Sequence, residues 1–304
     1  MNLSADVRDA VLLLAHGSPD SVDEVPEFLN QITRGRPVPP EVVEEVKHRY
    51  GLIGRSPLTD LTLQQGKLLG EAVQLPVYVG MRNWKPFIAD TIAAMKRDGV
   101  GRATVICLAP QNSRTSVGLY RQALNVEGGA PFAVEFVESW HDHPLLIAAF
   151  AEKFRAGWAP ACIEMSAQLP VIFTAHSVPQ RTIADGDPYD TQTRETARLV
   201  ALRAGLAPEN WNFAFQSQGM SGGAWLGPRV EDTILELKAK GHRGVFVQPI
   251  GFLCDHVEVL YDIDIGFRDF AEKEGLRLWR AESLNDSPLL TGALADLARL
   301  RIAK

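Results

Sequence analysis

The chain has 304 residues, of which 46% are hydrophobic and 22% are charged, and its formal net charge is −6. This composition is typical of a globular protein with one large domain or two of about 150 residues, and it leaves no basic surface for nucleic acid. No apolar run is as long as a membrane span, and the N-terminal residues are polar and acidic where a signal peptide would be basic and then apolar. We therefore expect a cytoplasmic protein with no integral membrane association.

The three cysteines, Cys107, Cys162 and Cys254, are far apart, and no Cys-x-x-Cys pair is present. This spacing argues against a zinc site, an iron–sulfur cluster or a disulfide framework and favours structural thiols. The chain also lacks the G-x-G-x-x-G fingerprint and the lysine motif of a phosphate loop, so the sequence gives little support for nucleotide binding.

Strand-like and helical segments alternate along nearly the whole chain. Short apolar runs predict strands at Val11–Ala15, Val77–Gly80, Ala103–Leu108, Phe132–Phe136, Val171–Thr174, Asn212–Phe215, Gly244–Pro249 and Leu276–Trp279. Helical periodicity is found at Val22–Thr33, Glu41–Tyr50, Leu58–Val73, Pro86–Arg97, His143–Phe154, Thr191–Ala204, Pro228–Lys240, Val257–Lys273 and Pro288–Leu300. Alternation with crossovers of this length predicts an α/β fold with parallel sheets covered by helices on both faces.

Two of the predicted strands end in the same way. The first strand runs into Ala-His-Gly-Ser-Pro with His16, and the strand that begins at Val171 runs into Ala-His-Ser with His176. We predict two similar halves, residues 1–160 and 161–304, with a linker near Ala159–Ala161, each bringing one histidine to a shared cleft at the carboxyl ends of the strands. The alternative for either histidine alone is a turn with a hydrogen-bonded imidazole.

The interval of about 60 residues between the first two strands is too long for an ordinary connection, and such excursions are usually binding loops or lids. It leaves from the strand end that carries His16, so we expect it to form one wall of the cleft. Arg34, Arg36 and Arg55 lie in it and supply fork-shaped donors that suit carboxylates or phosphates. Solvated arginines on a surface loop are the alternative.

A concentrated acidic segment follows the strand Gly244–Pro249. If it is helical from Asp255, then Asp255, Glu258 and Asp262 share one face, and their mutual repulsion raises the pKa of at least one of them. A histidine at one strand end and carboxylates at another suit chemistry that moves protons or divalent cations. Metal insertion into a tetrapyrrole requires both, because two pyrrole protons must leave as the cation enters.

The sequence resembles the ferrochelatases over essentially its whole length. The His176 motif and the Asp-His-x-Glu-x-Leu-Tyr motif, in this order, are specific. The matching segments are residues 14–19, 34–36, 50, 53–58, 80–82, 109–110, 113, 174–179, 216–217, 225–228 and 255–262.

The resemblance implies two Rossmann-like halves of the class I chelatase type, with a porphyrin cleft and a last helix that packs back on the first half. It implies a lyase of haem biosynthesis that inserts iron into a porphyrin, with Fe²⁺ as a substrate and no organic cofactor. His176 is expected to ligate the metal or accept a proton, with Glu258 opposite it, and the further candidate metal ligands are His16 and Asp262. The residues expected to contact the porphyrin are His16, Arg34, Arg55, Ser56, Arg82, Ser113 and Ser217. We expect a monomer or weak dimer whose partners include later enzymes of the haem pathway.

Three positions depart from the family pattern. Gly266 stands where the family commonly has an acid, and Asp264 is a possible substitute in the outer acidic path. His16 stands where many bacterial relatives carry tyrosine, which suggests a further metal ligand, and Gly54-Arg55 replaces the usual Gly-Gly.

The choice of porphyrin stays open at this point. The motif variants favour coproporphyrin III, whose four propionates suit additional arginines, over protoporphyrin IX with two. The other hypotheses are a noncatalytic haem or porphyrin carrier and a cobalt or nickel chelatase for another tetrapyrrole.

Overall fold

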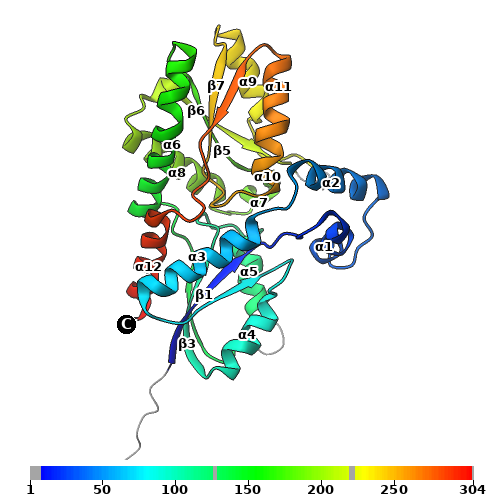
Figure 1. The fold of residues 1–304 in the computed structure, drawn as a ribbon, viewed down its shortest axis with the longest axis vertical. Helices are drawn as coiled ribbons and strands as arrows, with labels where there is room; N and C mark the ends of the chain where they lie inside the picture. Colours follow the sequence, from blue (N-terminus) through cyan, green and yellow to red (C-terminus); the bar gives the residue numbers. More distant parts are fainter. Residues whose placement is uncertain (1–7, 126–128, 219–222, 303–304) are drawn as a thin grey trace, which may run out of the picture. The chain divides into compact units, whose positions relative to one another are not determined.

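The computed structural model describes residues 8–125, 129–218 and 223–302. The chain divides into two compact units, which we describe separately (Figure 1). Unit 1 consists of Met1–Pro110, Ser116–Trp140 and Asn285–Lys304, and unit 2 of Gln111–Thr115 and His141–Leu284.

Each unit contains a four-stranded parallel sheet, and all the predicted strands are found. In unit 1 the strands are β1 (Arg8–Ala15), β2 (Val77–Met81), β3 (Val100–Cys107) and β4 (Ala133–Val137), in the order β2-β1-β3-β4. In unit 2 they are β5 (Val171–His176), β6 (Trp211–Gln216), β7 (Gly244–Pro249) and β8 (Arg277–Arg280), in the order β6-β5-β7-β8. The predicted α/β fold with two similar halves is confirmed.

Helices cover both sheets. Those of unit 1 are the 3-10 turn η1 (Val22–Glu24), α1 (Val25–Thr33), α2 (Pro40–Ile53), α3 (Leu58–Val73), α4 (Ile88–Arg97), α5 (Val117–Leu124) and α12 (Pro288–Ile302). Those of unit 2 are α6 (Pro144–Met165), α7 (Gln180–Ala184), α8 (Tyr189–Ala204), the 3-10 turn η3 (Pro208–Asn210), α9 (Val230–Ala239), α10 (Val257–Leu260), the π-helix η4 (Asp262–Phe267) and α11 (Arg268–Lys273). Within the described residues, no helix has the length and apolar character needed to cross a bilayer.

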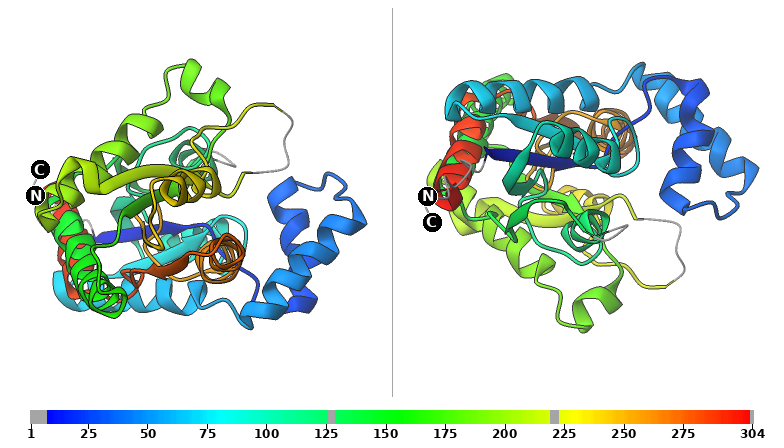
Figure 2. Two further views of the ribbon diagram at one scale, coloured as in Figure 1. Left: turned by 90° about the horizontal axis from the view of Figure 1, so that it is seen from above. Right: turned by 90° about the horizontal axis from the view of Figure 1, so that it is seen from below.

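The long excursion after β1 forms a helical pair. Figures 1 and 2 show α1 and α2 side by side beyond the carboxyl end of β1. Both helices have only a few buried side chains, Val25 and Phe28 in α1 and Tyr50 in α2. These buried residues hold the pair in place.

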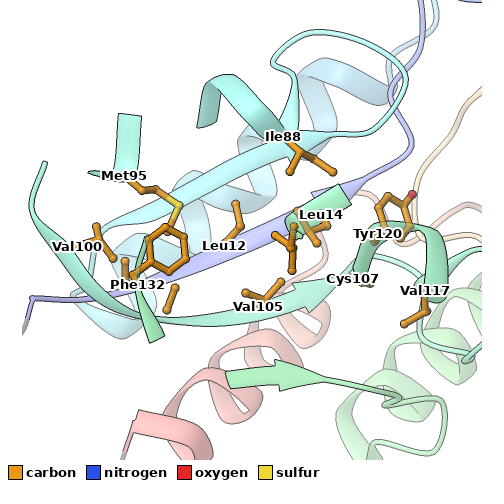
Figure 3. Close-up of a cluster of buried hydrophobic side chains, with 13 residues drawn as sticks. Leu12, Leu14, Ile88, Met95, Val100, Val105, Cys107, Val117, Tyr120 and Phe132 are labelled. Carbon is orange, nitrogen blue, oxygen red and sulfur yellow. The ribbon is translucent and has the colours of Figure 1, made fainter. Parts of the chain in front are cut away.

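One hydrophobic cluster of unit 1 lies between its sheet and the helices α4 and α5. Leu12, Leu14 and Val105 from the sheet pack with Ile88 and Met95 from α4 (Figure 3). Strands buried on both faces are continuous apolar runs, which is why β1 and β3 were predictable from the sequence.

The two sheets repeat each other residue by residue at the ends of their central strands. Ala15 pairs with Met81, and Ala175 pairs with Phe215. The Met81 amide donates to the carbonyl of Pro86 (2.7 Å), and the Phe215 amide to that of Pro228 (2.8 Å). The histidine that follows each alanine therefore takes the same place in its own sheet.

The expected linker at Ala159–Ala161 is wrong, because these residues lie inside α6. A proline in a helix interior removes one backbone hydrogen bond and usually ends or bends the helix. Here Phe150 and Phe154 bury the same helix in the core of unit 2, and it continues beyond Pro160 to Met165. The chain instead enters and leaves unit 2 between residues 110 and 116, and passes between the units near residue 140 and near residue 285. The last helix, α12, therefore belongs to unit 1, where it packs on α3.

Candidate active site

His176 is the last residue of β5, at the carboxyl end of the sheet of unit 2. Its Nδ1 atom donates a hydrogen bond to the carbonyl oxygen of Ser177, which can only accept. The other ring nitrogen, Nε2, lies 3.0 Å from Oε1 of Glu258. The imidazole is thus fixed with Nε2 directed at the carboxylate.

This contact is an ion pair in the metal-free protein. Burial opposes charge on the imidazole, but the charge of Glu258, its hydrogen bond and the nearby Asp262 outweigh burial and raise the pKa of His176 to about 9. Burial likewise disfavours the charged carboxylate, yet His176 and His256 hold the pKa of Glu258 well below its usual value. The side chains remain 33% and 35% exposed, so the pair is accessible from one side.

A second histidine lies against the other oxygen of Glu258. Nε2 of His256 is 3.3 Å from Oε2, and its Nδ1 donates to the carbonyl of Cys254 (2.9 Å). The amide of Gln216 also donates to the backbone carbonyl of Glu258 (2.7 Å). His256 belongs to the Asp-His-x-Glu motif, but no role for it is predictable from the sequence.

Asp262 is a second carboxylate near His176, in addition to Glu258. It begins the π-helix η4 and accepts a hydrogen bond from the hydroxyl of Ser217, whose backbone is left-handed (φ 58°). The structure therefore brings four of the predicted site residues, His176, Ser217, Glu258 and Asp262, to one end of unit 2. Within the described part of the chain, no three His, Cys, Asp or Glu side chains form a preassembled metal site.

The expected row of three acids on one helical face is wrong. The residue before α10, His256, has an extended backbone (φ −164°), and the helix begins only at Val257. Asp255 instead accepts a hydrogen bond from Ser283 (2.7 Å). Asp264, the expected substitute for the missing acid, is bound through both of its oxygens by Arg280 (2.7 and 2.8 Å) and is not free to extend an acidic path.

The equivalent histidine of unit 1 has a different partner. Nδ1 of His16 donates to the carbonyl of Gly17 (2.9 Å), and Nε2 lies 3.0 Å from the amide nitrogen of Asn83. Both ring nitrogens of His16 are therefore in contact with neighbouring polar groups. Phe28 of α1 makes an edge contact with the same ring (6.1 Å between centroids). Asn83 was missed, since no local spacing links it to His16.

Arg34 and Arg82 form a positively charged region of unit 1. Burial, with the charge of Arg34 nearby, lowers the pKa of the Arg82 guanidinium, which lies 5.4 Å from the ring centre of Tyr120. Its Nε atom is buried and has no hydrogen-bond partner among the described residues. Within that same part of the chain, no carboxylate pairs with either arginine. The two cations therefore have no carboxylate counter-charge among the described residues.

The remaining predicted contacts are less suited to a substrate. Arg55 lies between two carboxylates, those of Asp20 and Asp60, each at 3.1 Å. Ser113 is fully buried and donates to Asp187 (3.1 Å), so it offers no surface to a ligand. Ser56 is also buried, and its hydroxyl has no hydrogen-bond partner among the described residues.

Comparisons with known proteins concern the chain as a whole. A family model described as ferrochelatase matches residues 8–302. The chain is 57% identical to a ferrochelatase of Acidobacterium capsulatum, over 96% of this chain and 94% of that protein. It is 34% identical to a coproporphyrin III ferrochelatase of a Geobacillus species, over 98% and 99%. A solved structure of SirB from Bacillus subtilis with Fe³⁺ shares the fold, with a TM-score of 0.56 at 12% identity and coverage of 98% and 96%. The chain therefore belongs to the ferrochelatase family.

Proposed function

We propose that this protein is a lyase of haem biosynthesis that inserts Fe²⁺ into a porphyrin, with His176 and Glu258 as its catalytic residues. The observation that carries the proposal is the accessible contact between Nε2 of His176 and Oε1 of Glu258 at the end of a parallel sheet. Ligands of open α/β sheets bind at this end, and a charged pair of this kind is a common sign of a reactive site.

The pair suits both parts of the reaction. In the metal-free protein Nε2 of His176 carries a proton, and a ferrous ion that binds Nε2 must displace it, because proton and ion use the same lone pair. Loss of the Nε2 proton also ends the hydrogen bond from His176 to Oε1 of Glu258, so this carboxylate oxygen is free to accept a proton from the porphyrin. Two protons leave the porphyrin for each iron ion, and the exposure of Glu258 allows it to pass the first to water before it accepts the second.

Asp262 and Ser217 have supporting roles in this proposal. The charge of Asp262 adds to the effect of Glu258 on His176, and the hydroxyl of Ser217 fixes the orientation of Asp262. We do not assign His16 as a metal ligand, because its Nε2 already faces the amide of Asn83. Its proposed role is contact with the substrate.

We further propose coproporphyrin III as the preferred porphyrin, with protoporphyrin IX as the alternative. Arg34 and Arg82 support this choice, since cations without carboxylate partners among the described residues suit the propionates, of which coproporphyrin III has more. Relatives named coproporphyrin III ferrochelatase add support. The cytoplasmic location, the monomeric or weakly dimeric state and the transfer of product to later haem enzymes are proposals from the sequence alone.

The test is anaerobic insertion of Fe²⁺ into coproporphyrin III and protoporphyrin IX, followed side by side by absorbance, with Co²⁺ and Ni²⁺ as competing metals. The proposal predicts faster insertion of Fe²⁺ into coproporphyrin III. Faster insertion into protoporphyrin IX would reverse the order of the two porphyrins. Tight porphyrin or haem binding without any acceleration of insertion would favour the carrier, and turnover only with Co²⁺ or Ni²⁺ would favour a different tetrapyrrole chelatase.

A further inference from the structure

The segment that carries Glu258 has little regular structure of its own. It passes from extended backbone at His256 into α10, which has four residues, and then into the π-helix that begins at Asp262. Short helices are marginal in isolation, because each hydrogen bond gained costs the ordering of several residues. The position of Glu258 must therefore depend on contacts with the rest of unit 2.

Arg280 of β8 supplies such contacts at both ends of the segment. On the far side, its Nε and Nη2 atoms donate to the two oxygens of Asp264, at 2.7 and 2.8 Å. On the near side, its Nη1 lies 3.4 Å from Oδ1 of Asp255. Nη1 also donates to the carbonyl of Ala281 (2.9 Å), which ties the guanidinium to its own strand. Only 12% of the Arg280 side chain is exposed.

The two acids that Arg280 binds bracket the two that the proposed reaction uses. Asp255 and Asp264 lie before and after Glu258 and Asp262 in the chain, and all four carboxylates occur within ten residues, 255–264. A cation between the outer pair reduces the repulsion within this acidic segment. Arg280 thus binds the two outer acids, while Glu258 contacts His176 and His256, and Asp262 contacts Ser217.

We propose that Arg280 is a positioning residue, which binds Asp255 and Asp264 at once and thereby holds Glu258 in hydrogen-bond contact with His176. The predicted effect of Arg280 on catalysis rests on the proposed function. The predicted effect of Arg280 on the contact between His176 and Glu258 does not depend on that function.

The shape of the guanidinium is essential to this role. A bidentate contact with Asp264 and a third contact with Asp255 require a planar fork with several fixed donors. Lysine retains the charge but offers a single point of attachment. Arg280→Lys should therefore preserve the charge balance and lose most of the positional control.

The experiment compares Arg280→Met and Arg280→Lys with the control Arg268→Met. Arg268 is a suitable control because it also approaches Asp264, but only at 4.0 Å from the carboxylate, and its other contacts are to the backbone carbonyls of Asp264 and Leu278. The first readout is a crystal structure of each metal-free variant. We expect the 3.0 Å contact between His176 and Glu258 to open in Arg280→Met and to persist in Arg268→Met.

The second readout is iron insertion as a function of pH. We expect kcat to fall by about a hundredfold in Arg280→Met, because a displacement of about 1 Å at a reacting group has an effect of this size. The KM for porphyrin should be nearly unchanged. If Glu258 moves away, the pKa of His176 falls and the pH–rate profile shifts to lower pH. If Arg280 acted only through its charge, its removal would leave the carboxylates uncompensated and shift the profile to higher pH.

An unchanged contact and an unchanged pH profile in both Arg280 variants would overturn the inference, as would a shift to higher pH. Should Arg280→Met fail to fold, Arg280→Lys decides the question by the same two readouts. Wild-type protein that inserts no iron would refute the proposed function, whereas the crystallographic comparison would still test the positioning role.

Discussion

Replacement of Glu258 by glutamine separates the charge of the carboxylate from its shape. The amide of Glu258→Gln can keep the hydrogen bond to Nε2 of His176, but the negative charge is lost. Glu258 supplies the largest contributions that oppose burial, whereas Ser177 and Asp262 remain, so the pKa of His176 should fall from about 9 toward its ordinary value of 6.5. At pH 7, a complete fall of this pKa to 6.5 would raise the neutral fraction of His176 from roughly one in a hundred to roughly three in four, which is the upper limit of the expected change.

The assay is a pH titration of the histidine side chains of the metal-free protein by NMR, with the His176 signal assigned by its loss in His176→Gln. Asp262→Asn is the matched control, because Asp262 contributes less than Glu258 to the raised pKa of His176 and should produce a smaller shift in the same direction. A wild-type His176 that titrates near 6.5, or one whose titration does not respond to Glu258→Gln, would refute the electrostatic reasoning.

Three further predictions concern pH and the unit 1 residues. The pKa of His176 is about 9 in the folded protein and 6.5 ordinarily, so the contribution of its charge to stability is complete below pH 6.5 and is lost as the pH rises to 9. The Tm of the wild type should therefore fall over this pH range, and the Tm of His176→Gln should fall less. Arg82→Met should raise KM for coproporphyrin III by about tenfold or more in steady-state assays, because a charge-assisted contact is lost. Arg55→Met should change KM little, because the Arg55 guanidinium is already paired with Asp20 and Asp60. Asn83→Asp places a carboxylate beside His16 and should raise the pKa of that imidazole, visible in the same NMR titration; an unchanged His16 signal would contradict the contact seen here.

The sheets were predictable from the sequence because of how they are buried. Strands such as β1, β5 and β7 are covered on both faces, so their sequences are nearly continuous apolar runs with clear ends. Helix limits were less predictable. Pro160 indicated a break, yet the packing of α6 outweighs the loss of one backbone hydrogen bond.

The site was predictable only as far as its residues are adjacent to strand ends or share a motif. His176 and Glu258 were found in this way. Their charge states, and the partners of Arg55, Asp255 and Asp264, depend on side chains that are distant in sequence, and no spacing rule brings these together. The position of His256 is not predictable from its motif, because its ring lies beside the carboxylate of Glu258 in a segment whose backbone is extended at residue 256 and helical only from Val257.

The account depends most on Glu258 as the proton acceptor beside His176. Its most direct test is a single-turnover measurement of Fe²⁺ insertion into coproporphyrin III already bound to the protein, in wild type and in Glu258→Gln. The account predicts rapid insertion by wild type and a loss of about a hundredfold or more in the variant, with porphyrin affinity retained. Equal insertion rates in the two proteins, with porphyrin bound equally well, would contradict it.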